Sequence, residues 1–151
     1  MKLVDRFLAY AADFEKTVSD DRWSRLEPYF TEDAVYETYG EMGRRTDGRA
    51  AIFKRLRQEL DAFDRRCNSR RIVTTSGPVE DDGRVLRSWV CTFHLDGAAD
   101  LMIEGSERIT YRGDRIAMLE EELSEASERR LLTWVQLNPQ AFSASAVAAL
   151  F

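Results

Sequence analysis

Four consecutive segments in the second half of the chain have strand propensity and are separated only by short turn signals. They cover residues 70–79, 84–95, 101–112 and 115–123, and the turns contain Asp81-Asp82-Gly83, Asp96-Gly97 and Gly113-Asp114. Glycine and aspartate between strands are typical of hairpins, because these residues accept the backbone angles of a tight turn. The spacing therefore predicts an antiparallel meander.

Helical patterns dominate the first half of the chain. In residues 2–18 apolar side chains recur every three or four positions, which predicts a helix with one buried face. A shorter helix containing Trp23 and Leu26 is expected after Asp21, and a third over residues 48–66, capped by Asp47. Residues 34–38 are predicted as a strand and residues 40–48 as a loop. This order predicts an α+β fold with helices packed on one face of a bent sheet.

The C-terminal part adds a further helical segment. Residues 125–137 are predicted to be helical, Asn138-Pro139 ends the helix, and an apolar tail with Phe142, Val147 and Leu150 follows. We expect residues 1–124 to form the domain and residues 125–151 to be a C-terminal helical extension of it. The extension could cap a pocket or pack across a dimer.

Composition excludes several classes of function. The net charge of −5, from 27 acidic and 22 basic side chains, argues against a nucleic-acid ligand. No apolar run is long enough to span a membrane, and Asp5 and Asp13 interrupt the N-terminal segment, so we expect a cytoplasmic protein. Two cysteines and one histidine indicate free thiols, with no metal site and no cofactor.

Three stretches match a known pattern: Asp21–Glu37 (DRWSRLEPYFTEDAVYE), Gly48–Ile52 (GRAAI) and Gly105–Ile116 (GSERITYRGDRI). They resemble the nuclear transport factor 2-like superfamily, in particular its SnoaL-like, polyketide cyclase-like branch. The resemblance implies a cone in which a curved antiparallel sheet wraps around three N-terminal helices and encloses one apolar pocket. It also implies a homodimer paired through the outer face of the sheet. The superfamily includes isomerases, cyclases, dehydratases and non-catalytic binding subunits, so fold alone does not select an activity.

The catalytic residues of the superfamily's steroid isomerases carry over only in part. Their phenol on the first helix corresponds to Phe14, and their proton-shuttling carboxylate to Thr38. Their third group, an acid that donates to the developing oxyanion, corresponds to Glu107. Steroid isomerisation is therefore disfavoured, and the scytalone dehydratase type is excluded because it needs paired histidines.

Strand alternation and the resemblance together select the side chains that face the pocket. The carboxylates Glu107 and Glu121 are expected to face inward, whereas His94 should point outward and Glu120 and Glu122 into solvent. The expected ligand-binding side chains are Tyr10, Phe14, Tyr36, Thr38, Trp89, Cys91, Phe93, Ile109 and Leu119.

Two buried carboxylates in an aromatic pocket would have raised pKa values, which is the condition for acid–base catalysis. One hypothesis is a cofactor-independent isomerase, cyclase or dehydratase acting on an apolar carbonyl compound. In it Glu121 is the general base, Glu107 the neutral acid, and Tyr36 orients the substrate. Alternatively, the carboxylates form structural ion pairs with Arg87 or Arg108. The protein is then a hydrophobic-ligand-binding or accessory protein, including one like the β subunit of a ring dioxygenase.

Overall fold

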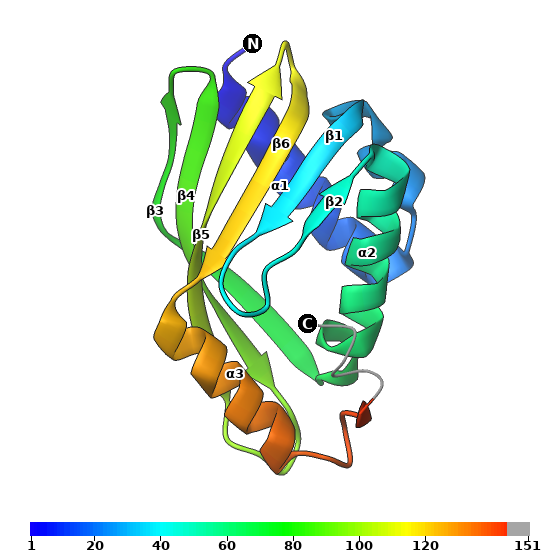
Figure 1. Cartoon of the computed structure of the whole chain (residues 1–151), viewed down its shortest axis with the longest axis vertical. Helices are drawn as coiled ribbons and strands as arrows, with labels where there is room; N and C mark the ends of the chain where they lie inside the picture. The colour runs from blue at the N-terminus through cyan, green and yellow to red at the C-terminus, as the bar shows by residue number, and fades with distance from the viewer. Residues whose placement is uncertain (145–151) are drawn as a thin grey trace.

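The predicted meander provides four of the six strands in the computed structural model, which describes residues 1–144 (Figure 1). These strands are β3 (Ser69–Asp81), β4 (Arg84–His94), β5 (Leu101–Arg112) and β6 (Arg115–Leu123). Each pairs antiparallel with the next. The prediction of a meander is confirmed, and its turns place Gly83, Gly97 and Gly113 at positive φ.

Two further strands extend the sheet beyond β6. β1 (Phe30–Thr38) lies next to β6, and β2 (Arg45–Asp47) forms the edge, so the order is β2-β1-β6-β5-β4-β3. β1 runs parallel to β6, so the expectation of a wholly antiparallel sheet is wrong at this one pairing. β2 lies in the segment predicted as a loop, because three residues are too few to show an alternating pattern.

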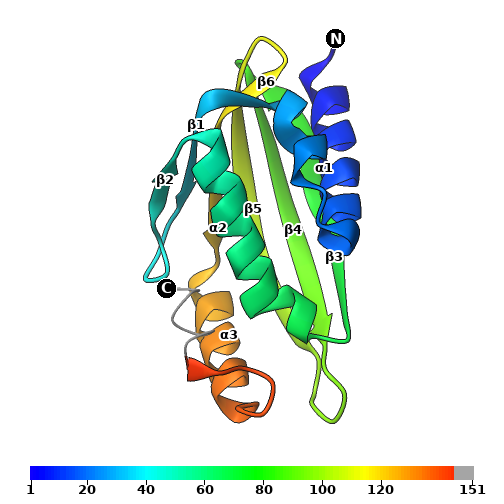
Figure 2. The ribbon, with the colours of Figure 1, turned by 90° about the vertical axis from the view of Figure 1, so that its right-hand side faces the viewer.

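The helices α1 (Leu3–Asp20) and α2 (Arg49–Ala62) cover one face of the sheet (Figure 2). The predicted second helix is the 3-10 helix η1 (Trp23–Tyr29), which contains Pro28, and η2 (Asp64–Arg66) follows α2. Asp47 does not cap α2: the N-cap residue is Gly48, and the Asp47 carboxylate accepts hydrogen bonds from Arg45.

The buried side chains form two clusters. The first lies between α1, η1, α2 and the sheet, and its fully buried members include Phe7, Leu26, Phe30, Ile52, Ile109 and Ile116. The second contains the aromatic side chains Phe63, Phe93, Trp134 and Phe142. The apolar stripes of the predicted helices and the alternation of the strands account for both clusters.

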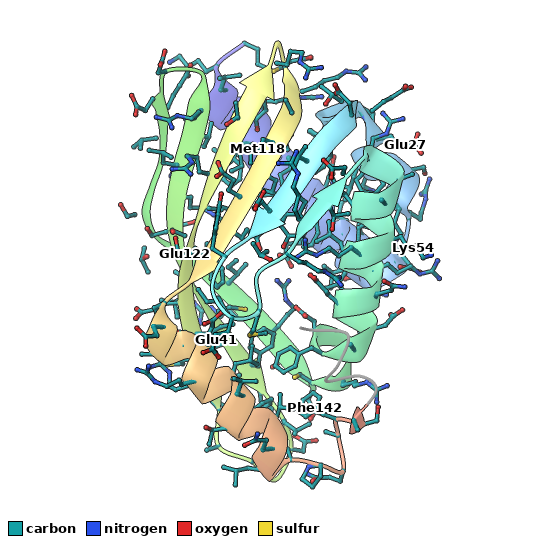
Figure 3. All side chains as sticks on the ribbon, in the orientation of Figure 1. Glu27, Glu41, Lys54, Met118, Glu122 and Phe142 are labelled. Atoms are coloured by element: carbon teal, nitrogen blue, oxygen red, sulfur yellow. The ribbon has the colours of Figure 1, made fainter. Side chains whose placement is uncertain are left out.

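The helix α3 (Glu125–Leu137) lies at the lower end of the sheet in Figure 1, and its N-cap is Ser124, whose side chain accepts a hydrogen bond from the Ser127 N–H. The ring of Phe142, which is labelled in Figure 3, packs against the rings of Phe63 and Trp134, with centroid distances of 5.2 Å and 5.5 Å, respectively. Val147 and Leu150 of the predicted tail lie outside the described residues. Within residues 1–144, no helix is long and apolar enough to cross a membrane.

Candidate functional site

A cavity of about 300 Å³ lies between the helices and the sheet. All strands except β2 contribute to its lining, together with α1, α2 and α3. Residues of both buried clusters line it, for example Tyr10 and Tyr36 from the first and Trp89 and Phe93 from the second. The two clusters therefore do not merge into one filled core, and the space between them is available to a ligand.

Glu107 and Glu121 both line this cavity, from β5 and β6. They are directly opposite each other in the antiparallel pairing of the two strands. Such cross-strand partners have Cβ atoms about 4.5–5.5 Å apart. The structure therefore brings two carboxyl groups close together, and Glu107 is buried.

The two carboxyl groups share a hydrogen bond, and each has a further polar partner of a different kind. The Arg87 guanidinium contacts Glu107 Oε1 through Nε at 2.6 Å and through Nη2 at 2.5 Å. The Tyr36 hydroxyl donates to Glu121 Oε2 at 2.9 Å. The positive charge therefore lies beside Glu107, whereas the further partner of Glu121 is a neutral hydrogen-bond donor.

This asymmetry determines which carboxyl group holds a proton. Burial and the neighbouring Glu107 raise the pKa of Glu121 to about 8. Burial also raises the pKa of Glu107, but Arg87 opposes the rise. We infer that the pair retains a proton at neutral pH and that Glu121 carries it, with Glu107 as the carboxylate. These roles are the reverse of those expected from the sequence.

Of the expected ligand-binding side chains, Tyr10, Phe14, Tyr36, Trp89, Cys91, Phe93 and Leu119 line the cavity. The Tyr10 hydroxyl makes no hydrogen bond to any described residue, and burial raises its pKa, so it stays a neutral phenol. Ile109 does not line the cavity. Its side chain is fully buried in the first cluster, where it packs as core.

Thr38 lines the cavity, but its hydroxyl is engaged in a network with α2. It accepts hydrogen bonds from Arg55 Nη2 at 2.8 Å and from the Arg44 N–H at 3.0 Å. Arg55 is buried, lies 4.1 Å from the centroid of the Tyr36 ring and donates to Glu59 at 2.8 Å. The hydroxyl of Thr38 therefore holds Arg55, which in turn packs against the Tyr36 ring.

A second polar group lines the cavity around Arg70 of β3. Arg70 pairs with Asp64 at 2.9 Å and with Glu15 at 2.6 Å, and burial raises the pKa of Asp64 to about 6. Strand alternation could have predicted that Arg70 faces the cavity. Arg70 and Ile72 are two positions apart on β3 and both line the cavity, as Arg87 and Trp89 do on β4.

The remaining candidates do not supply a nucleophile or a metal site. Burial raises the pKa of Cys91 to about 11 and that of Cys67 to about 12, so both stay protonated thiols. His94 is half exposed at the end of β4 and contacts Asp96 and Asp100. Among residues 1–144, no group of three or more His, Cys, Asp or Glu side chains is arranged to hold a metal ion.

The expectation that Glu120 is solvated is wrong. Its side chain is buried on the other side of β6, where Arg108 Nη2 and the Tyr39 hydroxyl contact Oε1 at 2.8 Å and 2.5 Å. These contacts lower its pKa, with Arg108 the larger cause. Arg108 therefore pairs with Glu120 and not with Glu107 or Glu121, and Arg87 is the arginine that contacts Glu107.

Gly105 has no side chain, and this allows the Trp89 ring, which lines the cavity, to lie close to the backbone of β5. A Cβ atom at this position would lie 2.8 Å from Trp89 Cζ2 and 2.7 Å from the Glu122 carbonyl oxygen. Because the backbone oxygen cannot move freely, we expect Gly105→Ala to lower the free energy of unfolding by about 1–3 kcal/mol. Urea denaturation measures this change, and Ser106→Ala, at the next, exposed position, is the control. An unchanged midpoint for Gly105→Ala would contradict the close contact.

Comparison with solved structures finds similar folds along most of the chain. TerC, co-crystallised with polyporic acid, matches with a TM-score of 0.66 and 14% identity, over 87% of this chain and 98% of TerC. A nuclear transport factor 2-like protein of unknown function from Burkholderia pseudomallei matches with a TM-score of 0.64 and 10% identity, over 88% of this chain and 99% of that one.

A third similar structure is a protein with a ketosteroid isomerase-like fold from Catenulispora acidiphila, in complex with trimethylamine. It matches with a TM-score of 0.58 and 17% identity, over 78% of this chain and 87% of that one. No protein-family model and no curated protein sequence matches the chain.

Proposed function

We propose that this chain, which has the fold of the nuclear transport factor 2-like proteins, is a cofactor-independent enzyme that acts on an apolar carbonyl compound. The reaction class is isomerisation, cyclisation or dehydration by carboxyl acid–base chemistry. The observation that supports this proposal is the opposed pair Glu107 and Glu121 in an aromatic cavity of about 300 Å³. A buried pair that shares a proton at neutral pH can donate and accept protons in the same site.

In the proposed reaction one carboxyl group acts on the carbon next to the substrate's carbonyl and the other on the carbonyl oxygen. Arg87 contacts Oε1 of Glu107, and once the substrate displaces the hydrogen bond between Glu107 and Glu121, the other carboxylate oxygen can accept a proton from the carbon next to the carbonyl. The electron pair of the broken C–H bond forms the C=C bond of an enol. The carbonyl oxygen takes the proton of Glu121 and accepts a hydrogen bond from the Tyr10 hydroxyl. Return of a proton to a different carbon completes an isomerisation.

The similar structures support the small-molecule part of the proposal. Two of them contain small organic molecules, polyporic acid and trimethylamine. The aromatic side chains Phe14, Trp89 and Phe93 offer flat apolar surfaces to a ligand, and the Tyr10 hydroxyl offers a free donor.

A ligand screen tests this function. The purified protein is screened by thermal shift and native mass spectrometry against a few hundred flat apolar carbonyl compounds, because a ligand of the folded state raises the melting temperature. We expect hits, and at least one hit whose mass or absorbance spectrum changes with time on the protein. If all hits remain chemically intact, the enzyme assignment is wrong.

The Arg87–Glu107 contact favours a second candidate function, in which the charged groups are structural and the cavity only holds a hydrophobic molecule. In this ligand-binding or accessory role, which includes one like the ring-dioxygenase β subunit, ligands bind without conversion. Substitution of either carboxyl group would then leave function unchanged. The same screen distinguishes the two functions by the fate of the bound compound.

We also propose that the protein is a cytoplasmic homodimer paired through the outer face of the sheet. Val73 of β3 and Met102 of β5 are about half exposed. Their register places them on the face opposite the cavity. Analytical ultracentrifugation is expected to give twice the chain mass of 17.4 kDa, and Val73→Arg is expected to shift the protein toward monomer. A monomer at micromolar concentration would contradict this prediction.

A further inference from the structure

A buried arginine lies beside the Tyr36 ring, on the side of the cavity that α2 contributes. Arg55 is 4% exposed and lines the cavity, and its Cζ atom is 4.1 Å from the centroid of the Tyr36 ring. The Tyr36 hydroxyl donates a hydrogen bond to Glu121 Oε2 at 2.9 Å. Arg55 therefore contacts the residue that binds the proposed acid of the site.

Four hydrogen bonds hold this guanidinium in place. Nη2 donates to the Thr38 hydroxyl at 2.8 Å, and Nη1 donates to the Thr46 hydroxyl at 3.2 Å and to the Arg44 carbonyl oxygen at 3.1 Å. Nε donates to Glu59 Oε1 at 2.8 Å. The partners belong to β1, β2, the segment between these strands and α2. The guanidinium therefore cannot turn away from the Tyr36 ring without breaking several of these bonds.

Stability of the fold alone is a weak reason for this arrangement. A buried ion pair is often no more stabilising than well-packed apolar side chains of the same volume, because both charges lose their hydration. The Arg55–Glu59 pair nevertheless lies in the wall of the cavity, and both residues line it. The charge of Arg55 is therefore better explained by the site that it borders.

A cation over the face of a phenol ring makes the hydroxyl a stronger hydrogen-bond donor. The positive charge is attracted to the electron-rich face of the ring and stabilises the phenolate more than the phenol. Burial and nearby carboxylates raise the pKa of Tyr36, and Arg55 opposes this rise. A stronger donor favours the charged form of its acceptor, so Arg55 eases the loss of the proton from Glu121.

We propose that Arg55 is a positioning residue of the reaction: it fixes Tyr36 and, through the Tyr36 hydroxyl, controls how readily Glu121 gives up its proton. This inference rests on the proposed function, in which Glu121 protonates the carbonyl oxygen. When that proton leaves, the hydrogen bond from Tyr36 stabilises the new carboxylate. Glu59 acts in the opposite direction, because its negative charge disfavours a second carboxylate nearby, and it contributes to the raised pKa of Glu121.

The titratable and charged groups that act on Glu121 and Tyr36 come from several elements. They are Tyr10 of α1, Tyr36 of β1, Arg55 and Glu59 of α2, Arg87 of β4, Glu107 of β5 and Glu121 of β6. Burial is the largest cause of the raised pKa of Glu121, and Glu107 is the largest electrostatic cause. The Arg55–Glu59 pair can be altered without changing either carboxyl group of the reaction, so it is suited to a test.

NMR of the protein labelled with carbon-13 at the glutamate side-chain carboxyls tests the inference without a substrate. The resonance of Glu121 is the one missing from Glu121→Gln, and its change from pH 5 to pH 10 gives the midpoint of the titration. We expect Arg55→Gln to raise this midpoint by about one pH unit, because Tyr36 becomes a weaker donor and Glu59 loses its partner. We expect Glu59→Gln to lower it by a similar amount.

Further variants separate this effect from a purely structural one. Arg55→Lys keeps the positive charge and should stay closer to the parent midpoint than Arg55→Gln. Arg57→Gln removes an exposed arginine from the same helix, where it pairs with Asp21 at 2.9 Å, and should leave the midpoint unchanged. A structural role would not move the midpoint in opposite directions for the two partners of one ion pair.

An unchanged midpoint in both Arg55→Gln and Glu59→Gln overturns the inference, and so does a shift of both in the same direction. If Arg55→Gln does not fold, the result for Glu59→Gln decides alone.

Turnover gives a second readout. For any compound that the protein converts in the ligand screen, the loss of rate at alkaline pH should move with the midpoint in each variant. A rate profile that stays in place while the midpoint moves overturns the role of Arg55 in the reaction. If the midpoints move as expected and no compound is converted, the proposed function fails, whereas the control of Glu121 by Arg55 is supported.

Discussion

The protein is expected to lose stability as the pH rises from 5 to 9, and Glu121→Gln should remove much of that loss. The folded-state pKa of Glu121 is about 8, and its ordinary value is 4.5. The folded state therefore binds more protons than the unfolded state between these values. Because the folded pKa is raised, Glu121 contributes stability below about pH 4.5 that is lost as the pH rises through about 8.

The expected difference is large for a single side chain. It amounts to on the order of 4 kcal/mol of unfolding free energy between pH 5 and pH 9. Urea denaturation followed by circular dichroism measures it across this range. Parent and Glu121→Gln should have similar stability at pH 5, where the carboxyl group is protonated, and the variant should be the more stable at pH 9.

Asp64 and His94 also have raised pKa values, so they too make the folded protein less stable as the pH rises. The contribution of Glu121 is therefore given by the difference in unfolding free energy between Glu121→Gln and the parent at each pH. Glu125→Gln, whose carboxylate is exposed and paired only with Arg129, should follow the parent curve. Parallel curves for Glu121→Gln and the parent would show that Glu121 is ionised in the folded protein at neutral pH.

Turnover is expected to depend on the same residue. For any compound that the protein converts in the ligand screen, we expect Glu121→Gln to lower kcat/KM by about 10³-fold, since an amide cannot transfer the proton. Loss of the proton from Glu121 should also lower the rate of the parent above about pH 8. Stopped assays or absorbance changes measured from pH 6 to pH 9 give both quantities.

Two further variants separate catalysis from folding. Glu107→Gln should also reduce turnover strongly, because it removes the proposed proton acceptor, and Glu125→Gln should leave turnover unchanged. Circular dichroism spectra of all three variants should match that of the parent. Unchanged turnover in Glu121→Gln, with the fold intact, would contradict the acid–base mechanism and favour the ligand-binding function.

Much of the candidate site was predictable because alternation along a strand is a local property. Trp89, Cys91 and Phe93 lie at every second position of β4, and the structure places all three at the cavity. Glu107 and Glu121 follow the same rule on β5 and β6. Ile109 also follows it, but its side chain is fully buried in the first cluster, and local alternation carries no information about which inward side chains a cavity reaches.

The sequence by itself determined the order of the elements, the turns of the meander and the inward positions, because each of these depends on residues near one another in the chain. Only the tertiary structure decided the chemistry of the site. Arg87 and Glu107 are 20 positions apart, and Tyr36 and Glu121 are 85 positions apart. Their contacts, and the burial that raises the pKa of Glu121, arise from packing between distant segments. The assignment of acid and carboxylate therefore became possible only when β1, β4, β5 and β6 were placed side by side.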